Sequence, residues 1–169
     1  MDAGHLANDG RLQMLKVRGV DQAHLEASQA KGTRYHVEWV DIDDPDPTFP
    51  YTPGQPAPTA NDSALVYVGD QGRDRGAAGF SRLEGAIFDN GVVYFTSTQG
   101  GGAAMQGPNT TTGYGTGSGQ VWGYDTRSET LFLVYESPSR QVLDFPDNIT
   151  VSRRGTLILC EDNTEDNYV

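Results

Sequence analysis

The segment EGAIFDNGVVYFT, residues 84–96, aligns without a gap on NITVSRRGTLILC, residues 148–160. Each segment carries apolar residues on both sides of a turn that contains glycine, which is typical of a β-hairpin. One hairpin cannot bury its apolar face alone, so a repeated hairpin indicates units that stack on their neighbours. The repeat therefore predicts an all-β fold built from antiparallel blades.

Each copy of the repeat opens on a side chain that carries an oxygen atom. Glu84 and Asn148 lie seven residues before Gly91 and Gly155, the turn glycines of the two copies. Side chains repeated at one level of a radial array converge on a shared axis. Carboxylate and amide oxygens are the ligands of hard cations such as Ca²⁺. The repeat thus predicts a metal site at the mouth of a β-propeller.

The remaining apolar segments complete the blades. We expect a four-stranded blade within residues 81–137, with strands at 84–88, 92–97, 120–124 and 130–135. Residues 138–169 would begin the next blade, and residues 1–80 would belong to the preceding one. That preceding part contains expected strands at 11–17 and 35–42, a Pro-rich insertion at 48–63, and a loop or single helical turn at 71–80.

Composition narrows the classes of partner. The chain has 169 residues, 36% of them hydrophobic, and a formal net charge of −11, which places it among globular proteins. Because clustered Lys and Arg are sparse, nucleic acid is not expected as a partner. No apolar run is long enough to span a bilayer and no export signal is recognised, so we expect no membrane segment.

Five residues are candidate metal ligands, and each also has an interpretation that involves no metal. Glu84 at the head of an apolar strand suits a metal ligand, or an ion pair with Arg82 or Arg75. Asn148 follows Pro and Asp, so a turn role is equally open. Cys160 could be a small buried hydrophobe. Glu161 or Asp162 could be a ligand, but neighbouring side chains of an extended chain do not point the same way. These candidates are Glu84, Asn148, Cys160, Glu161 and Asp162.

An acidic segment, DIDDPD at residues 41–46, could also suggest a calcium loop. It lacks the glycine and the distal glutamate of an EF-hand, and it contains proline. A solvated loop is the favoured interpretation.

Several motifs, in order, resemble the PhoX-type alkaline phosphatases and their relatives: RLEG at 82–85, VYFTST at 93–98, GQVWGY at 119–124, PDN at 146–148 and GTLILCED at 155–162. The resemblance implies a six-bladed propeller, exported by the twin-arginine route to a periplasmic or extracellular location. It also implies hydrolysis of small phosphoesters at a cluster of Ca²⁺ and Fe³⁺.

Within that resemblance, Glu84 matches the glutamate of an Arg-Pro-Glu-Gly type motif and would be a metal ligand. Cys160 and Glu161 are similar to a Cys-Glu motif whose thiolate binds iron, although that motif normally lies in an earlier blade. Six blades of about 40–50 residues need more than about 240 residues. The chain is therefore expected to be part of a propeller, with open blade edges that could support self-association.

Two other functions fit the same residues. Glu-Gly followed by a glycine turn and Val-Tyr-Phe, within residues 84–95, also looks like the SMP-30 and gluconolactonase group, in which one metal activates water for lactone hydrolysis. A propeller can also serve as a binding module without enzymatic activity.

Overall fold

The computed structural model describes residues 10–48, 63–104, 115–163 and 168. Eight strands and one helix follow in the order β1(Gln13–Val17), β2(Arg34–Asp41), α1(Ser63–Asp74), β3(Leu83–Asp89), β4(Val92–Ser97), β5(Gln120–Asp125), β6(Thr130–Glu136), β7(Pro146–Val151) and β8(Leu157–Glu161). The prediction of an all-β antiparallel architecture is confirmed. All eight strands coincide with expected ones to within a few residues.

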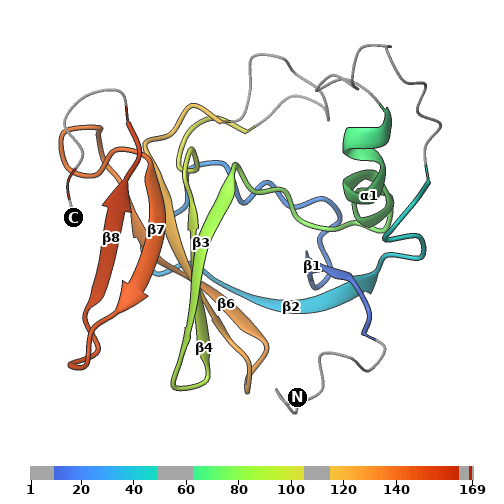
Figure 1. Ribbon diagram of the computed structural model, residues 1–169, viewed down its shortest axis with the longest axis horizontal. Helices are drawn as coiled ribbons and strands as arrows, with labels where there is room; N and C mark the ends of the chain where they lie inside the picture. The colour runs from blue at the N-terminus through green and yellow to red at the C-terminus, as the bar shows by residue number, and fades with distance from the viewer. Residues whose placement is uncertain (1–9, 49–62, 105–114, 164–167, 169) are drawn as a thin grey trace.

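Six strands form one antiparallel sheet in the order β1-β2-β6-β5-β4-β3, and β7 and β8 form a separate hairpin. Figure 1 shows that the sheet curls into a half-barrel, with the β7–β8 hairpin beside β3 and α1 at the far end of β2. This arrangement is consistent with part of a propeller.

The four expected strands of the central blade do pair with one another, but they do not stand alone. Residues 34–36 of β2 pair with residues 130–132 of β6, and residues 37–41 of β2 pair with β1. β2 therefore extends the sheet past β6 and carries β1 with it. The first part of the chain shares a sheet with the central strands, and its assignment to a preceding blade stays a prediction.

The core lies on the concave face of the curled sheet. Trp122, Leu131 and Val37 come from three adjacent strands, and each is fully buried. Leu25, from the segment between β1 and β2, packs into the same cluster and is 1% exposed. That segment contains helix-forming residues but is not helical. It crosses the sheet face through isolated bridges from His24 to Gly79 and from Ala27 to Gly102.

Helix α1 ends at Asp74 and so covers only the start of residues 71–80, where a loop or a single helical turn was expected; it also holds the acidic segment. Tyr67 donates a hydrogen bond to the Asp44 carboxylate, and the Gln71 amide both accepts from and donates to the Asp44 backbone. Arg75, just after the helix, pairs with Asp43. The acidic segment is therefore held by the helix. Most of the Pro-rich insertion, residues 49–62, lies outside the described residues.

Hydrogen bonds to aspartates shift the pKa values of two side chains in this part of the chain. The hydrogen bond to Asp44 raises the pKa of Tyr67 above its usual value, and a hydrogen bond to Asp21 raises that of Lys16.

In the part of the chain that the structure describes, no helix has the length and apolar character that crossing a membrane requires.

Candidate functional site

The hairpins β3–β4 and β7–β8 begin with the same unusual backbone geometry. Arg82 precedes β3 with φ of 53°, and Phe145 precedes β7 with φ of 55°. Residues other than glycine seldom adopt this left-handed conformation, and it occurs preferentially at functional sites. In each hairpin the residue after the second strand fixes this geometry: Thr98 N–H donates to the Arg82 carbonyl over 2.9 Å, and Asp162 N–H donates to the Phe145 carbonyl over 3.0 Å.

A β-bulge follows immediately in both hairpins. The pairing of β3 with β4 is interrupted between Leu83 and Ala86, and that of β7 with β8 between Pro146 and Ile149. Bulges redirect side chains and are common beside active sites. Glu84 and Asn148, the two residues that open the sequence repeat, both lie within these bulges.

The strand pairing corrects the gap-free alignment by one residue. Leu83 pairs with Ser97 as Pro146 pairs with Glu161, and Ala86 pairs with Phe95 as Ile149 pairs with Leu159. The structural equivalent of Glu84 is therefore Asp147, and the equivalent of Gly85 is Asn148.

The cause of this shift is the turn. The first hairpin closes through Asn90 and Gly91, whose φ values of 46° and 89° are those of a two-residue type I′ turn. The second closes over the three residues 153–155, since Ser152 N–H donates to the Thr156 carbonyl. A Ser-Arg-Arg-Gly turn lacks the Asn-Gly pair, and this difference is the sequence signal that could have revealed the extra residue and hence Asp147.

The two bulges lie against each other. A Cβ atom on Gly85 would approach the Asn148 Cα atom to 2.7 Å and the Asp147 carbonyl oxygen to 2.7 Å, so only glycine allows this contact. The Thr96 hydroxyl joins the two segments, because it accepts from Gly85 N–H over 3.1 Å and donates to the Asp147 carbonyl over 2.8 Å. The two bulges are therefore in backbone contact, and a cation shared by the Glu84 and Asn148 side chains stays a prediction.

Glu84 has a partner but is not enclosed. Its carboxylate lies 3.4 Å from the Arg82 guanidinium, and the two side chains are 35% and 36% exposed. The ion pair considered from the sequence therefore exists with Arg82, whereas Arg75 pairs with Asp43. An exposed ion pair of this kind is weak, about 0–1 kcal/mol, so the Glu84 carboxylate remains available to a cation.

The other opening residues differ in exposure. Asn148 is exposed and Asp147 is half-buried, and their side chains make no hydrogen bond or ion pair with other described residues, although the Asp147 carbonyl is held by Thr96. Oxygen donors from both hairpins thus lie on neighbouring segments. The donor set of Glu84, Asp147 and Asn148 is of the type that fits Ca²⁺.

The three candidates at the end of β8 divide between two roles. Both carboxylate oxygens of Glu161 accept backbone hydrogen bonds, from Asp144 N–H over 2.8 Å and from Tyr168 N–H over 3.2 Å. Cys160 and Asp162 are exposed, and they are equivalent in register to Thr96 and Thr98, whose side chains point together toward β7. Glu161 therefore fastens its own hairpin, and Cys160 and Asp162 share one outer face. The exposure of Cys160 also excludes its interpretation as a buried hydrophobe.

Among the described residues, no three His, Cys, Asp or Glu side chains are grouped closely enough to enclose a metal ion. Ca²⁺ takes six to eight oxygen ligands, so Glu84, Asp147 and Asn148 would supply only part of its coordination shell. These three residues fit Ca²⁺ by the chemistry of their oxygen atoms and by their positions on neighbouring strands.

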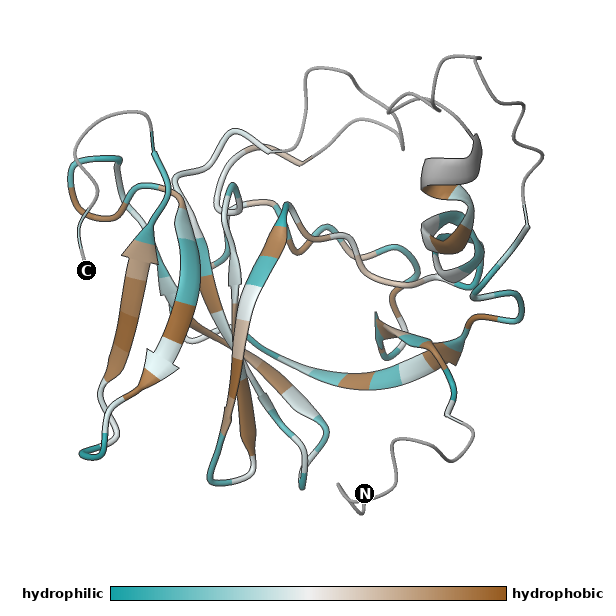
Figure 2. Ribbon diagram, in the orientation of Figure 1, coloured by the Kyte–Doolittle hydropathy of each residue, from teal (hydrophilic) through white to brown (hydrophobic). Residues whose placement is uncertain are grey.

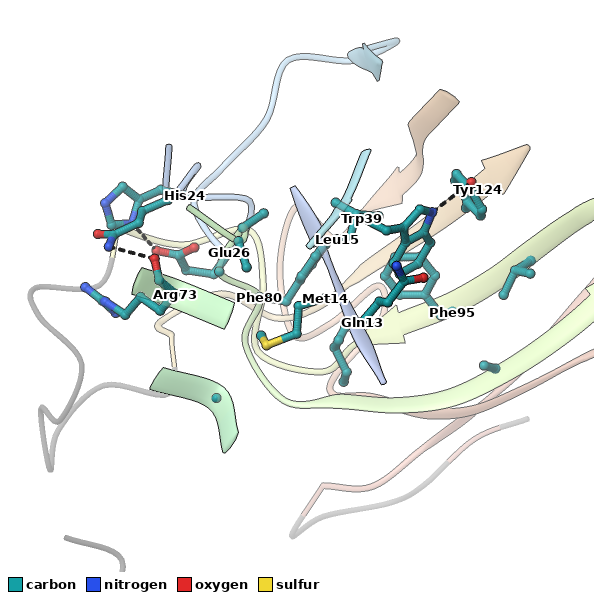
Figure 3. Close-up of a pocket in the computed structure, with 18 of the residues that line it drawn as sticks. Gln13, Met14, Leu15, His24, Glu26, Trp39, Arg73, Phe80, Phe95 and Tyr124 are labelled. Atoms are coloured by element: carbon teal, nitrogen blue, oxygen red, sulfur yellow. Dashed lines mark hydrogen bonds and ion pairs between the residues drawn. The ribbon is translucent and has the colours of Figure 1, made fainter. Parts of the chain in front are cut away.

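A pocket with a volume of about 750 Å³ opens beside Glu84. Leu83, Glu84 and Ala86 of β3 line one side of it, and its other walls come from β1, β2, β4, β5, α1 and the segment between β1 and β2. Figure 3 shows His24, Glu26 and Arg73 at one end of this pocket and Trp39, Phe95 and Tyr124 at the other. The pocket combines residues from segments that are far apart in the sequence, and no local sequence signal predicted it.

Comparison with known proteins gives one match. No curated protein and no solved structure matches the chain. The family model described as alkaline phosphatase PhoX matches residues 1–169, the whole of the chain. The chain whose two hairpins carry acidic and amide residues in their bulges therefore belongs to the PhoX alkaline phosphatase family.

Proposed function

We propose that this chain forms part of a metal-dependent phosphoester hydrolase, with Glu84, Asp147 and Asn148 as ligands of Ca²⁺. Membership of the PhoX family supports phosphatase-type hydrolysis with metal dependence at the level of the family. The observation that carries the assignment to these residues is the contact between the two bulges, where Gly85 meets the Asn148 backbone.

The chain's own residues prepare this site in three ways. The left-handed residues Arg82 and Phe145 set the direction in which each strand enters its bulge. Thr96 fixes the two bulges to each other. Arg82 holds the Glu84 carboxylate in the absence of a cation and, once released, is a donor for a phosphoryl oxygen. Bound cations would supply neutralisation of the phosphoryl charge.

The Fe³⁺ implied by the resemblance is assigned to the thiolate of Cys160 with the carboxylate of Asp162, because these two share a face of the hairpin. Glu161 is assigned the structural role that its two backbone hydrogen bonds define. The substrate class is a small phosphoester, and a periplasmic or extracellular location follows from the same resemblance. Self-association through the edge of β1 is part of the proposal, since β1 pairs only with β2 among the described strands.

The test measures phosphate release from p-nitrophenyl phosphate by the full-length protein supplied with Ca²⁺ and Fe³⁺. Glu84→Gln and Asp147→Asn should each lower kcat/KM by at least about 100-fold, because a ligand charge is lost. Glu38→Gln, an exposed glutamate on β2, is the matched control and should leave turnover unchanged. Terbium luminescence provides a readout of cation binding that does not depend on turnover, and both site variants should weaken it.

Two results would overturn the proposal. Hydrolysis of a sugar lactone without release of phosphate from the monoester would favour the lactonase alternative. Purified protein that contains no calcium and no transition metal, and that binds no terbium, would favour a binding module without enzymatic activity.

A further inference from the structure

The pocket beside β3 has two chemically different ends. Its apolar end is built from aromatic rings in edge-to-face contact: Trp39 meets Tyr124 with centroids 5.5 Å apart at 81°, and Phe80 meets Phe95 at 5.5 Å and 79°. Trp39 is 42% exposed although it belongs to this wall. Aromatic walls that remain open to solvent suit a flat apolar ligand.

The polar end is organised around a buried carboxylate. Glu26 is fully buried, and its Oε1 atom lies 2.6 Å from Nδ1 of His24. The His24 side chain is 53% exposed, and its Nε2 atom has no hydrogen-bond partner among the described residues. A buried carboxylate that accepts from Nδ1 fixes the orientation of the ring, and in the imidazolium form the Nε2–H group is a donor for an anionic ligand.

Of the charged residues that line the pocket, Arg73 has a guanidinium with no ion-pair partner among the described residues. Glu26 is paired with His24, and Glu84 is paired with Arg82. Arg73, in the last turn of α1, makes no ion pair with any described residue through its guanidinium. Its backbone carbonyl accepts a hydrogen bond from Gln22 over 3.0 Å, which anchors the helix end at the pocket. An unpaired guanidinium beside an apolar cavity is suited to a carboxylate or phosphate.

We infer that this pocket binds a small organic anion, with one or two aromatic rings against Trp39, Phe95 and Tyr124 and a carboxylate or phosphate group between Arg73 and His24. Both sets of side chains line the same pocket, and Figure 3 shows them at its opposite ends. The volume of about 750 Å³ is within the range of about 300–1,000 Å³ found for small-molecule sites. The inference does not rest on phosphatase activity, because none of these residues is assigned to the metal.

Calorimetric titration of the EDTA-treated protein tests the inference without any hydrolysis. The ligands are 1-naphthoate, 1-naphthyl phosphate, the neutral 1-naphthalenemethanol and the cationic 1-naphthylmethylammonium. At least one of the two anions should bind about tenfold or more tightly than the neutral alcohol, because a charge-assisted hydrogen bond is gained. The cation should bind more weakly than the alcohol. Comparison of the two anions identifies the head group that the site prefers.

Variants separate the two ends of the pocket. Arg73→Gln should reduce anion affinity to that of the alcohol, Arg73→Lys should retain part of the preference, and Arg154→Gln, at the exposed β7–β8 turn, should change nothing. Phe95→Leu should weaken all ligands about equally and preserve their ratio, with circular dichroism confirming the fold. Equal binding of all four ligands, no binding of any, or an anion preference that survives Arg73→Gln would overturn the inference.

Discussion

Gly85 of β3 and Asn148 of β7 are in direct backbone contact, and a single methyl group on Gly85 would lie 2.7 Å from the Asn148 Cα atom. This contact joins the six-stranded sheet to the β7–β8 hairpin at the two bulges. Because the neighbouring atoms belong to the backbone, no side-chain rotation can relieve the clash.

Gly85→Ala should therefore lower the free energy of unfolding by about 1–3 kcal/mol, the usual cost of overpacking. Urea denaturation measures the change. The matched control is Gly69→Ala in α1, where a Cβ atom would meet nothing within 4 Å. Alanine in a helix is favoured over glycine by about 0.5–1 kcal/mol, so the control should be stabilised. Equal behaviour of the two variants would show that the bulges are not packed together in solution.

Thr96 should contribute through its hydroxyl group rather than its shape. Thr96→Val keeps the branched side chain but leaves the Gly85 N–H and the Asp147 carbonyl without their shared partner, in a region where Thr96 itself is fully buried. Loss of a buried hydrogen-bond partner costs about 1–3 kcal/mol, which urea denaturation would detect. Thr150→Val, on the exposed side of β7, should have almost no effect. A Thr96→Val variant as stable as the wild type would contradict this account of the contact.

The sequence predicted the strands well because their signals are local. Alternating apolar residues and glycine turns located β3 to β8, and the repeat located the hairpins that carry the site. Figure 2 shows the apolar run of β8 that made this hairpin recognisable. The pairing of β2 with β6 depends on residues almost 100 positions apart, from Arg34 to Phe132, and no local pattern encodes it.

The sequence repeat located both bulges but aligned their residues one position out of register, and the metal site itself stays a prediction. A gap-free alignment cannot represent a turn that is longer by one residue, so it matched Glu84 with Asn148 where the strand pairing matches Glu84 with Asp147. The pocket escaped prediction for a different reason. His24, Trp39 and Arg73 come from three separate segments and converge only when β2 and α1 take their places in the fold.

Arg82 should compete with a cation for Glu84. Arg82→Gln removes the guanidinium that lies 3.4 Å from the Glu84 carboxylate, so Ca²⁺ or terbium affinity should rise about threefold to fivefold, in keeping with a weak exposed ion pair of up to about 1 kcal/mol. Terbium luminescence titration is the measurement. Arg18→Gln, which breaks the exposed pair with Glu129, is the control and should leave the affinity unchanged. A lower affinity in Arg82→Gln would mean that Arg82 positions Glu84 for the cation.

Asp125 should make the β5–β6 turn sensitive to acid. Its carboxylate accepts backbone hydrogen bonds from Arg127 over 2.8 Å and Ser128 over 3.3 Å, and the bond from Arg127 is the main reason that the pKa of Asp125 lies below the usual 3.8. A carboxylate whose pKa is lowered on folding stabilises the protein above its unfolded pKa, and this contribution disappears as the pH falls through the folded pKa.

Asp125→Ala should therefore be less stable than the wild type at about pH 7, and the difference should shrink as the pH falls below about 4, where the wild-type carboxylate becomes protonated. Urea denaturation of both proteins at a series of pH values measures it. Asp89→Ala, at the exposed end of β3, is the control, because its carboxylate accepts no hydrogen bond from the described residues. A stability difference for Asp125→Ala that stays constant from neutral to acidic pH would show that the ionised form is not what holds this turn.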